Sequence, residues 1–361
     1  MLQASARLYK NAYTGIPTQV WWLAVVMFVN RSGTMVIPFL TVYLTSRGYS
    51  LADAGLVMGA FGLGSIVGGY VGGRLTDRFG HFYVQFGSLF LNGVLFIVLG
   101  QMATLVQYAV CIFFLSSLGE AFRPANAAAI AQYSNETNRI RCYALNRLAI
   151  NLGWSIGPAV GGVLASIDYS YLFWADGITC MASSFLLFAG MSPTTKAKEK
   201  NPPLKNTLQA TSAYRDKPFL LGMFYLFLIG LSFFQLFSVL PAYYKTELRL
   251  NEATIGWILA MNGLLIAAIE MVLVYKLENR RHSLLYITTG ALLMGFSFLF
   301  LELGENLSVA VISMIIITFG EMFLFPFMNN FWVKRSTAAN RGEYAALYTM
   351  SFAAATVLAP T

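Results

Sequence analysis

Residues 72–82 read GGRLTDRFGHF, and this short polar stretch lies between two long apolar runs at about 52–73 and 82–102. Each run is close to the ~20 mostly apolar residues that a helix needs to cross a bilayer. The stretch is therefore expected to be a tight polar connection between two membrane-spanning helices. Gly73 and Gly80 permit a tight turn. Asp77 can cap the next span or a neighbouring helix, because a helix N-terminus favours an anion.

Apolar runs and polar connections alternate along the whole chain of 361 residues, of which 57% are apolar and only 11% charged. An ordinary soluble domain is excluded, because about a quarter of its residues would be charged. We predict an all-α integral membrane protein with eleven spans, at about 20–45, 52–73, 82–102, 106–131, 143–165, 170–191, 219–243, 253–275, 284–303, 308–332 and 343–361.

The basic residues predict the orientation. With the N-terminus in the cytoplasm, 18 of the 24 Lys and Arg lie on the cytoplasmic side, and Arg31, Arg123 and Arg147 lie inside spans. Short cytoplasmic loops carry such an excess of basic residues in membrane proteins. We predict a multi-pass protein of the cell inner or plasma membrane, and the net charge of +8 then needs no nucleic-acid partner.

The longest polar segment, 193–218, is predicted to be a cytoplasmic linker between an N-terminal six-helix bundle, 1–192, and a C-terminal bundle, 219–361. A shift of 201 residues aligns Gly, Glu, His and Tyr residues within corresponding spans, including Glu120 with Glu321. Repeated halves are typical of transporters built around a central site.

The same repeat predicts an incomplete second bundle. Gly157-Pro158 in span five corresponds, within a residue, to Ala359-Pro360. The C-terminal bundle is therefore expected to have five helices, with the chain ending inside span eleven of a twelve-span protein. A natural eleven-span chain is the alternative.

Five residues of the opening stretch are spaced as in a known signature, and they are Gly73, Leu75, Asp77, Arg78 and Gly80. They match G-x-L-x-D-R-x-G-R-K, so the chain resembles the major facilitator superfamily. His81 and Phe82 replace the two basic residues that usually close this signature. The resemblance implies two pseudo-symmetric six-helix bundles and a loop that opens and closes as a latch during transport. A simple turn with a capping Asp is the alternative.

Span five contains the stretch NLGWSIGPAVGGVLA, residues 151–165. Its glycines and proline are Gly153, Gly157, Pro158, Gly161 and Gly162. They resemble the G-x-x-x-G-P-x-x-G-G signature that the superfamily associates with antiporters, which favours export. Small residues four apart let helices approach closely, and a proline removes one backbone hydrogen bond and allows a bend. Helix packing alone is the alternative.

Charged residues inside the spans are the candidate functional residues. At ~1.5 Å per residue, Glu120, Glu321 and Arg31 all lie near mid-membrane. A charge there is unfavourable by at least ~2.5 kcal/mol, so it faces a cavity, pairs or is neutralised. Glu120 and Arg123 can pair, because they lie three residues apart on one helix. We predict that Glu120 and Glu321 bind protons, with Arg31 and Arg123 as counter-charges; static pairing that locks the bundle is the alternative.

In the superfamily, spans one, four, seven and ten line the central cavity. Residues of these spans with polar or aromatic side chains are the predicted lining: Asn30, Phe234, Gln235, Asn329 and Asn330. Packing in the core or against lipid is the alternative for each of them. Glu270 and Asp176 lie nearer the ends of their spans, where a side chain can reach the membrane interface, and we assign neither of them a functional role.

The sequence thus predicts a monomeric, proton-coupled secondary transporter without metal or cofactor, similar to the drug:proton antiporter branch. It would export small amphiphilic or drug-like molecules by alternating access. A proton-coupled symporter for a nutrient or metabolite is the alternative, with a substrate anion paired to Arg31 or Arg123. A membrane-embedded enzyme is a third hypothesis. It would need clustered metal ligands or a nucleophile beside a base within the spans, and the sequence places both histidines in loops.

Overall fold

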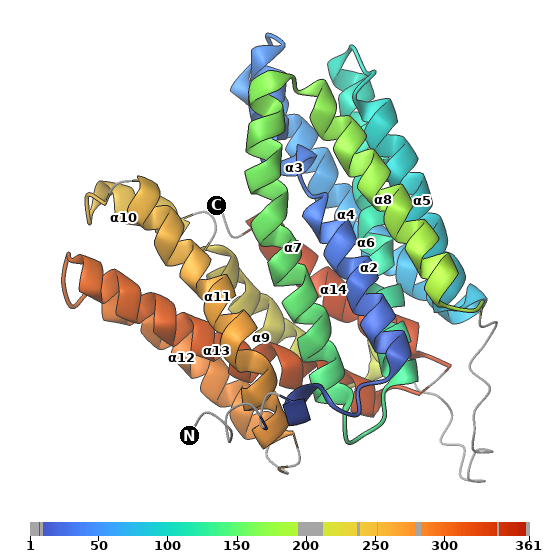
Figure 1. Ribbon diagram of the computed structural model, residues 1–361, viewed down its shortest axis with the longest axis vertical. Helices are drawn as coiled ribbons and strands as arrows, with labels where there is room; N and C mark the ends of the chain where they lie inside the picture. The colour runs from blue at the N-terminus through green and yellow to red at the C-terminus, as the bar shows by residue number, and fades with distance from the viewer. Residues whose placement is uncertain are drawn as a thin grey trace.

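The computed structural model describes residue 7 and residues 10–193, 212–236, 239–250, 252–278, 280, 283–337 and 339–358, and every regular element in these ranges is helical (Figure 1). The helices are α2 Thr18–Ser32, α3 Val36–Ser46, α4 Leu51–Phe79, α5 His81–Leu99, α6 Leu105–Tyr133, α7 Arg139–Ile167, α8 Ser170–Gly190, the 3-10 helix η1 Ala213–Arg215, α9 Lys217–Phe234, α10 Val239–Thr246, α11 Glu252–Leu277, α12 Ser283–Leu301, α13 Leu307–Arg335 and α14 Arg341–Leu358.

These helices follow the predicted spans in order. Ten helical segments of the described residues are long and apolar enough to cross a membrane. The helix α14, which corresponds to predicted span eleven, is not among those ten, and its first turn carries Arg341 and Glu343. Most of the predicted linker, 193–218, and the Ala359-Pro360 pair lie outside the described residues.

Predicted spans one and seven are each formed by two helices, α2 with α3 and α9 with α10. At the first break, the backbone N–H groups of Met35 and Val36 donate to the carboxylate of Asp176 at 3.0 and 2.9 Å. The side chain of Asp176 does not reach the membrane interface; it is buried where it satisfies the free N–H groups at the start of α3.

The helices divide into two groups (Figure 1). Those from α2 to α8 pack on one another, whereas α11 and α12 pack on α13 and α9 packs on α12. The helix α14 packs on α9 and also on α4 and α6. We refer to residues 10–193 as the first half and to residues 212–358 as the second half.

The two halves meet toward one end of the molecule, which we call the linker end because it carries the α4–α5 turn and residues 212–216. There α4 packs on α14, and α7 packs on α11 and α13. At the opposite end, α3 packs on helices of the first half and α10 packs on α11. Figure 1 shows α3 and α10 standing well apart. The halves therefore diverge away from the linker end.

Helices of the first half have counterparts in the second half, and the number of residues that separates two counterparts changes along the chain. The starts of α4 and α11, Leu51 and Glu252, differ by 201 residues. The starts of α6 and α13, Leu105 and Leu307, differ by 202, and the prolines inside them, Pro124 and Pro326, differ by 202 as well.

The expected pairing of Glu120 with Glu321 stays a prediction, because helix bounds vary by one or two residues with the way they are assigned. The contacts of the preceding glycines agree with it. A Cβ on Gly119 of α6 would approach Asn92 of α5, and a Cβ on Gly320 of α13 would approach Met294 of α12.

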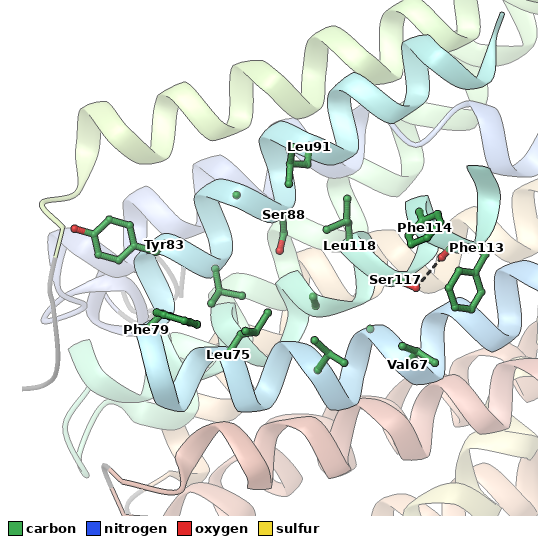
Figure 2. Close-up of a pocket in the computed structure, with 15 residues that line it drawn as sticks. Val67, Leu75, Phe79, Tyr83, Ser88, Leu91, Phe113, Phe114, Ser117 and Leu118 are labelled. Carbon is green, nitrogen blue, oxygen red and sulfur yellow. Dashed lines mark hydrogen bonds between the residues drawn. The ribbon is translucent and has the colours of Figure 1, made fainter. Parts of the chain in front are cut away.

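An apolar pocket of about 400 Å³ lies between α4, α5 and α6 (Figure 2). Leu75, Phe79 and Tyr83 line it toward the linker end, and Phe113 and Phe114 line its other end. Its lining contains no charged side chain. The pocket is therefore suited to apolar contacts and lies apart from the charged groups described below.

Candidate functional site

A buried ion-pair cluster joins the two halves within their long helices. Arg147 of α7 forms ion pairs with Glu270 of α11, at 3.3 Å, and with Glu321 of α13. The guanidinium also donates to the backbone carbonyl of Glu321 at 3.0 Å. Both carboxylate side chains are 2% exposed. Two ionised carboxylates and one guanidinium leave a buried charge of −1, and one proton on either carboxylate would neutralise it.

The two carboxylates of this cluster are held differently. Asn262 of α11 donates through its Nδ2 to Oε1 of Glu321 at 2.7 Å and to Oγ1 of Thr318 at 3.0 Å. Glu270 has the ion pair with Arg147, but neither of its oxygens has a hydrogen-bond partner within the described part of the chain. Glu321 is thus fixed by several groups, whereas Glu270 is the carboxylate with acceptor capacity left over.

Sequence reasoning identified Glu321 and missed its partners. The sequence identifies Arg147 only as an arginine inside a span and gives Glu270 no role, whereas the structure buries Glu270 to 1% exposure. The helix α11 packs on α7 and α13, which encloses this side chain. The sequence does hold one signal for these partners, because an arginine inside a membrane span is expected to pair with a carboxylate.

A second group of charges lies in the first half. Glu120 and Arg123 of α6 form the expected ion pair, with Nε and Oε2 at 3.2 Å. Glu120 is 14% exposed and Arg123 is 40% exposed. Arg31 at the end of α2 interacts electrostatically with both residues. Its guanidinium, however, forms no hydrogen bond or ion pair with any described residue, so the expected second partner of Glu120 is not paired with it.

The opening loop of the sequence forms a contact between the halves. Asp77 accepts hydrogen bonds from the backbone N–H of Gly342 at 2.6 Å and of Glu343 at 2.9 Å, and so caps the N-terminus of α14. Gly73 allows this approach, because a Cβ there would lie 2.6 Å from the carbonyl oxygen of Gly342. The prediction that Asp77 caps a neighbouring helix is confirmed, and that helix belongs to the other half.

The remaining residues of the loop signature have local roles. Gly80 ends α4 with a φ of 85°, a conformation that favours glycine. Arg78 is exposed, with its guanidinium 5.2 Å from the centre of the Phe79 ring. Leu75 lines the apolar pocket of Figure 2.

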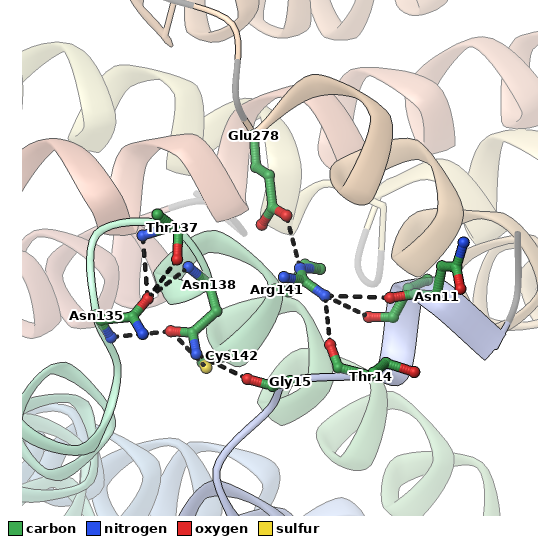
Figure 3. Close-up of polar contacts among 10 residues, drawn as sticks. Asn11, Thr14, Gly15, Asn135, Thr137, Asn138, Arg141, Cys142 and Glu278 are labelled. Carbon is green, nitrogen blue, oxygen red and sulfur yellow. Dashed lines mark hydrogen bonds and ion pairs between the residues drawn. The ribbon is translucent and has the colours of Figure 1, made fainter.

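A further contact at the linker end involves residues that the sequence did not single out (Figure 3). Arg141 of α7 pairs with Glu278, just after α11, at 2.7 Å. Its Nη1 donates to the backbone carbonyls of three residues that precede α2, and these are Asn11, Ala12 and Thr14. Burial raises the pKa of the Glu278 carboxyl, although the guanidinium beside it acts in the opposite direction.

Asp216 organises the second half at the same end. It caps α9 through the N–H of Phe219, accepts from Arg335 Nε at 2.8 Å and accepts from the Tyr344 hydroxyl at 2.8 Å. The hydrogen bonds from Arg335 hold the pKa of Asp216 below its usual value. This carboxylate therefore joins the ends of α9, α13 and α14.

The glycines of the span-five motif pack α7 against the α2–α3 region. A Cβ on Gly153 would lie 2.6 Å from the Cβ of Arg31, and one on Gly157 would lie 2.8 Å from the carbonyl oxygen of Thr34. A Cβ on Gly161 would lie 3.0 Å from Met35, whereas one on Gly162 would make an ordinary contact. The helix continues through Pro158. The packing function of this motif is confirmed, and its link to export remains a prediction.

The predicted cavity-lining residues are not gathered in one place. Asn30 donates to Sγ of Cys180 at 3.4 Å inside the first half. Asn329 donates to the carbonyl of Phe325, four residues earlier in its own helix. The others lie in the second half: the ring of Phe234 packs on Phe352, the carbonyl of Gln235 accepts from the N–H of Leu240 at the α9–α10 break, and Asn330 is buried. Their contact with a substrate remains a prediction.

The sequence matches that of a known protein family. The sequence pattern of the Major Facilitator Superfamily matches residues 20–360. The chain belongs to this superfamily. It is therefore a multi-pass membrane transporter of small molecules and not an enzyme.

Several superfamily members are similar in sequence over most of their length. The chain is 23% identical to the MFS-type transporter YqjV of Bacillus subtilis, covering 90% of this chain and 80% of that protein. It is 24% identical to a Na(+), Li(+), K(+)/H(+) antiporter of Planococcus maritimus, covering 92% and 85%. It is 26% identical to the multidrug resistance protein MdtH of Aeromonas salmonicida, covering 77% and 71%.

Solved structures of the superfamily share the fold. FucP in the outward conformation matches with a TM-score of 0.71 and 12% identity, over 97% of this chain and 91% of FucP. The proton:xylose symporter XylE matches with a TM-score of 0.68 and 17% identity, over 95% and 87%. At such identities the likeness concerns the fold alone.

Proposed function

We propose that this protein is a proton-coupled secondary transporter that exports small amphiphilic or drug-like molecules. The observation that carries the proposal is the cluster of Arg147, Glu270 and Glu321. It is buried within the spans and its members come from both halves, so its protonation state acts directly on the contact that must change during alternating access.

The proposed cycle starts from the arrangement described above. If the linker end is cytoplasmic, as the basic residues predict, the halves are closed toward the cytoplasm and diverge toward the outside. The predicted bundles, 1–192 and 219–361, would then be the units that move. The contacts of Asp77 with α14 and of Arg141 with Glu278 are those that must break when the cytoplasmic side opens.

Protonation supplies a reason for them to break. A proton on Glu270 or Glu321 removes one of the two attractions that hold Arg147 of the first half to the second half. The other carboxylate still balances Arg147, so the proton removes the excess negative charge and weakens the attraction between the halves without leaving a buried charge unpaired. Glu270 is the better first acceptor, because its oxygens lack other hydrogen bonds.

The charged residues of the first half are not the site of coupling in this proposal. Glu120 is committed to Arg123 within one helix, so its protonation does not separate the halves directly. Arg31 and Arg123 lie beside it as counter-charges and as groups that a substrate can meet.

The direction of transport is argued separately from the coupling site. The span-five motif and the likeness to an antiporter and to a multidrug resistance protein favour export from a cell inner membrane, by a monomer. The shared fold with the symporter XylE keeps proton-coupled uptake as the second candidate.

Substrate-induced proton movement in proteoliposomes tests this function. A panel of fluorescent amphiphiles, both cationic and anionic, would be added to the parent protein and to Glu270→Gln and Glu321→Gln. We expect substrate to release lumenal protons through the parent and not through either variant. Glu302→Gln, at an exposed carboxylate just beyond α12, is the matched control. Normal coupling in both cluster variants would refute the proposed role of the cluster.

A further inference from the structure

Arg31 carries a charge that nothing in its surroundings neutralises. It lies in the middle of the segment Thr18–Ser46, near the centre of the membrane. Within the described residues its guanidinium has no hydrogen bond and no ion pair, and its Nε is enclosed without a partner. A lone charge at this depth is unfavourable, so guanidinium groups inside spans normally pair or face a water-filled space.

The charges around Arg31 do not balance. It interacts electrostatically with Arg123 and Glu120, and Glu120 is already paired with Arg123. Two guanidinium groups therefore share one carboxylate, which leaves one positive charge in excess. The carboxylates of Glu270 and Glu321 both pair with Arg147 and form no ion pair with Arg31.

Arg123, which interacts with Arg31, lies at the boundary between the two halves. The side chain of Arg123 is 40% exposed, yet Arg123 interacts electrostatically with Tyr348 of α14, which belongs to the second half. Its open side is thus turned toward the region that a substrate must cross. A guanidinium presents its N–H groups in one plane, in a geometry that matches the two oxygens of a carboxylate or sulfonate.

We propose that Arg31 and Arg123 bind an anionic group of the transported molecule, so that the substrate class is an amphiphilic anion with a carboxylate, sulfonate or phosphate. This inference rests on the proposed function and narrows it. Arg31 is the principal contact, since Arg123 keeps Glu120 as its partner. A lipophilic cation would instead meet the excess positive charge and be disfavoured.

Two probes of equal size and opposite charge test the proposal. Naphthalene-2-sulfonate and 2-naphthyl-trimethylammonium would be titrated by calorimetry into the full chain in lipid nanodiscs. We expect the parent to bind the sulfonate and Arg31→Gln to bind it about tenfold more weakly or worse, since a charge-assisted hydrogen bond is lost. Arg31→Lys should fall between the two. Arg47→Gln, at an exposed arginine after α3, should match the parent.

Three results would overturn the anion site: no binding of the sulfonate to the parent, equal binding of the ammonium probe, or unchanged sulfonate binding in Arg31→Gln. If thermal unfolding shows that Arg31→Gln does not fold, sulfonate binding is compared between the parent and the variants Arg31→Lys and Arg123→Lys instead. Transport under a pH gradient separates this proposal from the proposed function. Proton-driven movement of the ammonium probe alone would sustain the transporter and reject the anion site. Arg31-dependent sulfonate binding without proton-driven movement would sustain the anion site and reject the coupling.

Discussion

The helices α6 and α13 occupy equivalent places in the two halves but use their charges differently. In α6, Glu120 pairs with an arginine of its own helix and remains partly exposed. In α13, Glu321 is buried and pairs with Arg147 from the other half. The difference follows from the neighbours of each glutamate, because Arg123 lies one turn further along α6 itself, whereas α13 packs on α7, which carries Arg147. Equivalent helices can thus carry a local ion pair in one half and an ion pair between halves in the other.

Removing the arginine from each pair should give the largest contrast. Arg147→Gln leaves two buried carboxylates without a counter-charge, and we expect it to lower the free energy of unfolding by ~3–5 kcal/mol. Arg123→Gln removes an arginine that is 40% exposed, so its effect should stay within ~1 kcal/mol. Unfolding in denaturing detergent measures both. Equal effects would show that the two pairs are energetically alike, and the triple variant Arg147→Gln, Glu270→Gln, Glu321→Gln should recover part of the loss.

A second contrast uses the glycines that precede the glutamates. A Cβ at Gly320 would lie 2.9 Å from the carbonyl oxygen of Gly290 and 2.7 Å from the side chain of Met294, so Gly320→Ala should destabilise by ~1–3 kcal/mol. A Cβ at Gly119 would lie 3.3 Å from the movable amide of Asn92 and near nothing else, so Gly119→Ala should be neutral or stabilising by up to ~1 kcal/mol. Thermal unfolding of the pair checks the order, and a more harmful Gly119→Ala would contradict it.

The cap at the linker end should show a smaller effect on the equilibrium between conformations. Asp77→Ala removes two hydrogen bonds to the N-terminus of α14, which is typically worth ~1–2 kcal/mol, so the linker end should open about tenfold more often. Spin labels on α4 and α14 would report the distance. Arg78→Gln, at an exposed neighbour, is the control. An unchanged distance distribution in Asp77→Ala would mean that the cap does not hold the halves together.

The smallest expected effect is a pH dependence. The pKa of Asp216 is depressed in the folded protein by its hydrogen bonds from Arg335. Its contribution is therefore complete above the unfolded pKa of about 3.9 and is lost as the pH falls through the lower folded value. We expect no more than ~1 kcal/mol, because Arg335 is 35% exposed. The melting temperature of the parent should therefore fall at acid pH by an amount that is missing in Asp216→Asn. The same dependence of melting temperature on pH in both proteins would contradict the stabilising role of the Asp216 carboxylate.

The sequence predicted most of the helices because membrane spans follow from long apolar runs. It did not predict the breaks after Ser32 and Phe234, because each break lies inside one predicted span whose apolar residues continue on both sides.

The candidate site was only partly accessible from the sequence. The local pair of Glu120 and Arg123 follows from helical spacing, and it was predicted. The partner of Glu321 depends on how α7 packs against α11 and α13, which spacing along the chain does not encode. Likewise, the sequence identified Asp77 as a cap but could not choose α14 as the helix that it caps.

The Arg141 contact has a consequence for biosynthesis. It joins carbonyls that precede the first span to a carboxylate after α11, and these segments leave the ribosome at widely separated times. Until α11 has been inserted, the guanidinium can hold only the N-terminal segment. Closure of the linker end is therefore among the last steps of assembly, and premature arrest of translation would leave a first half with its own segment tethered but its partner missing.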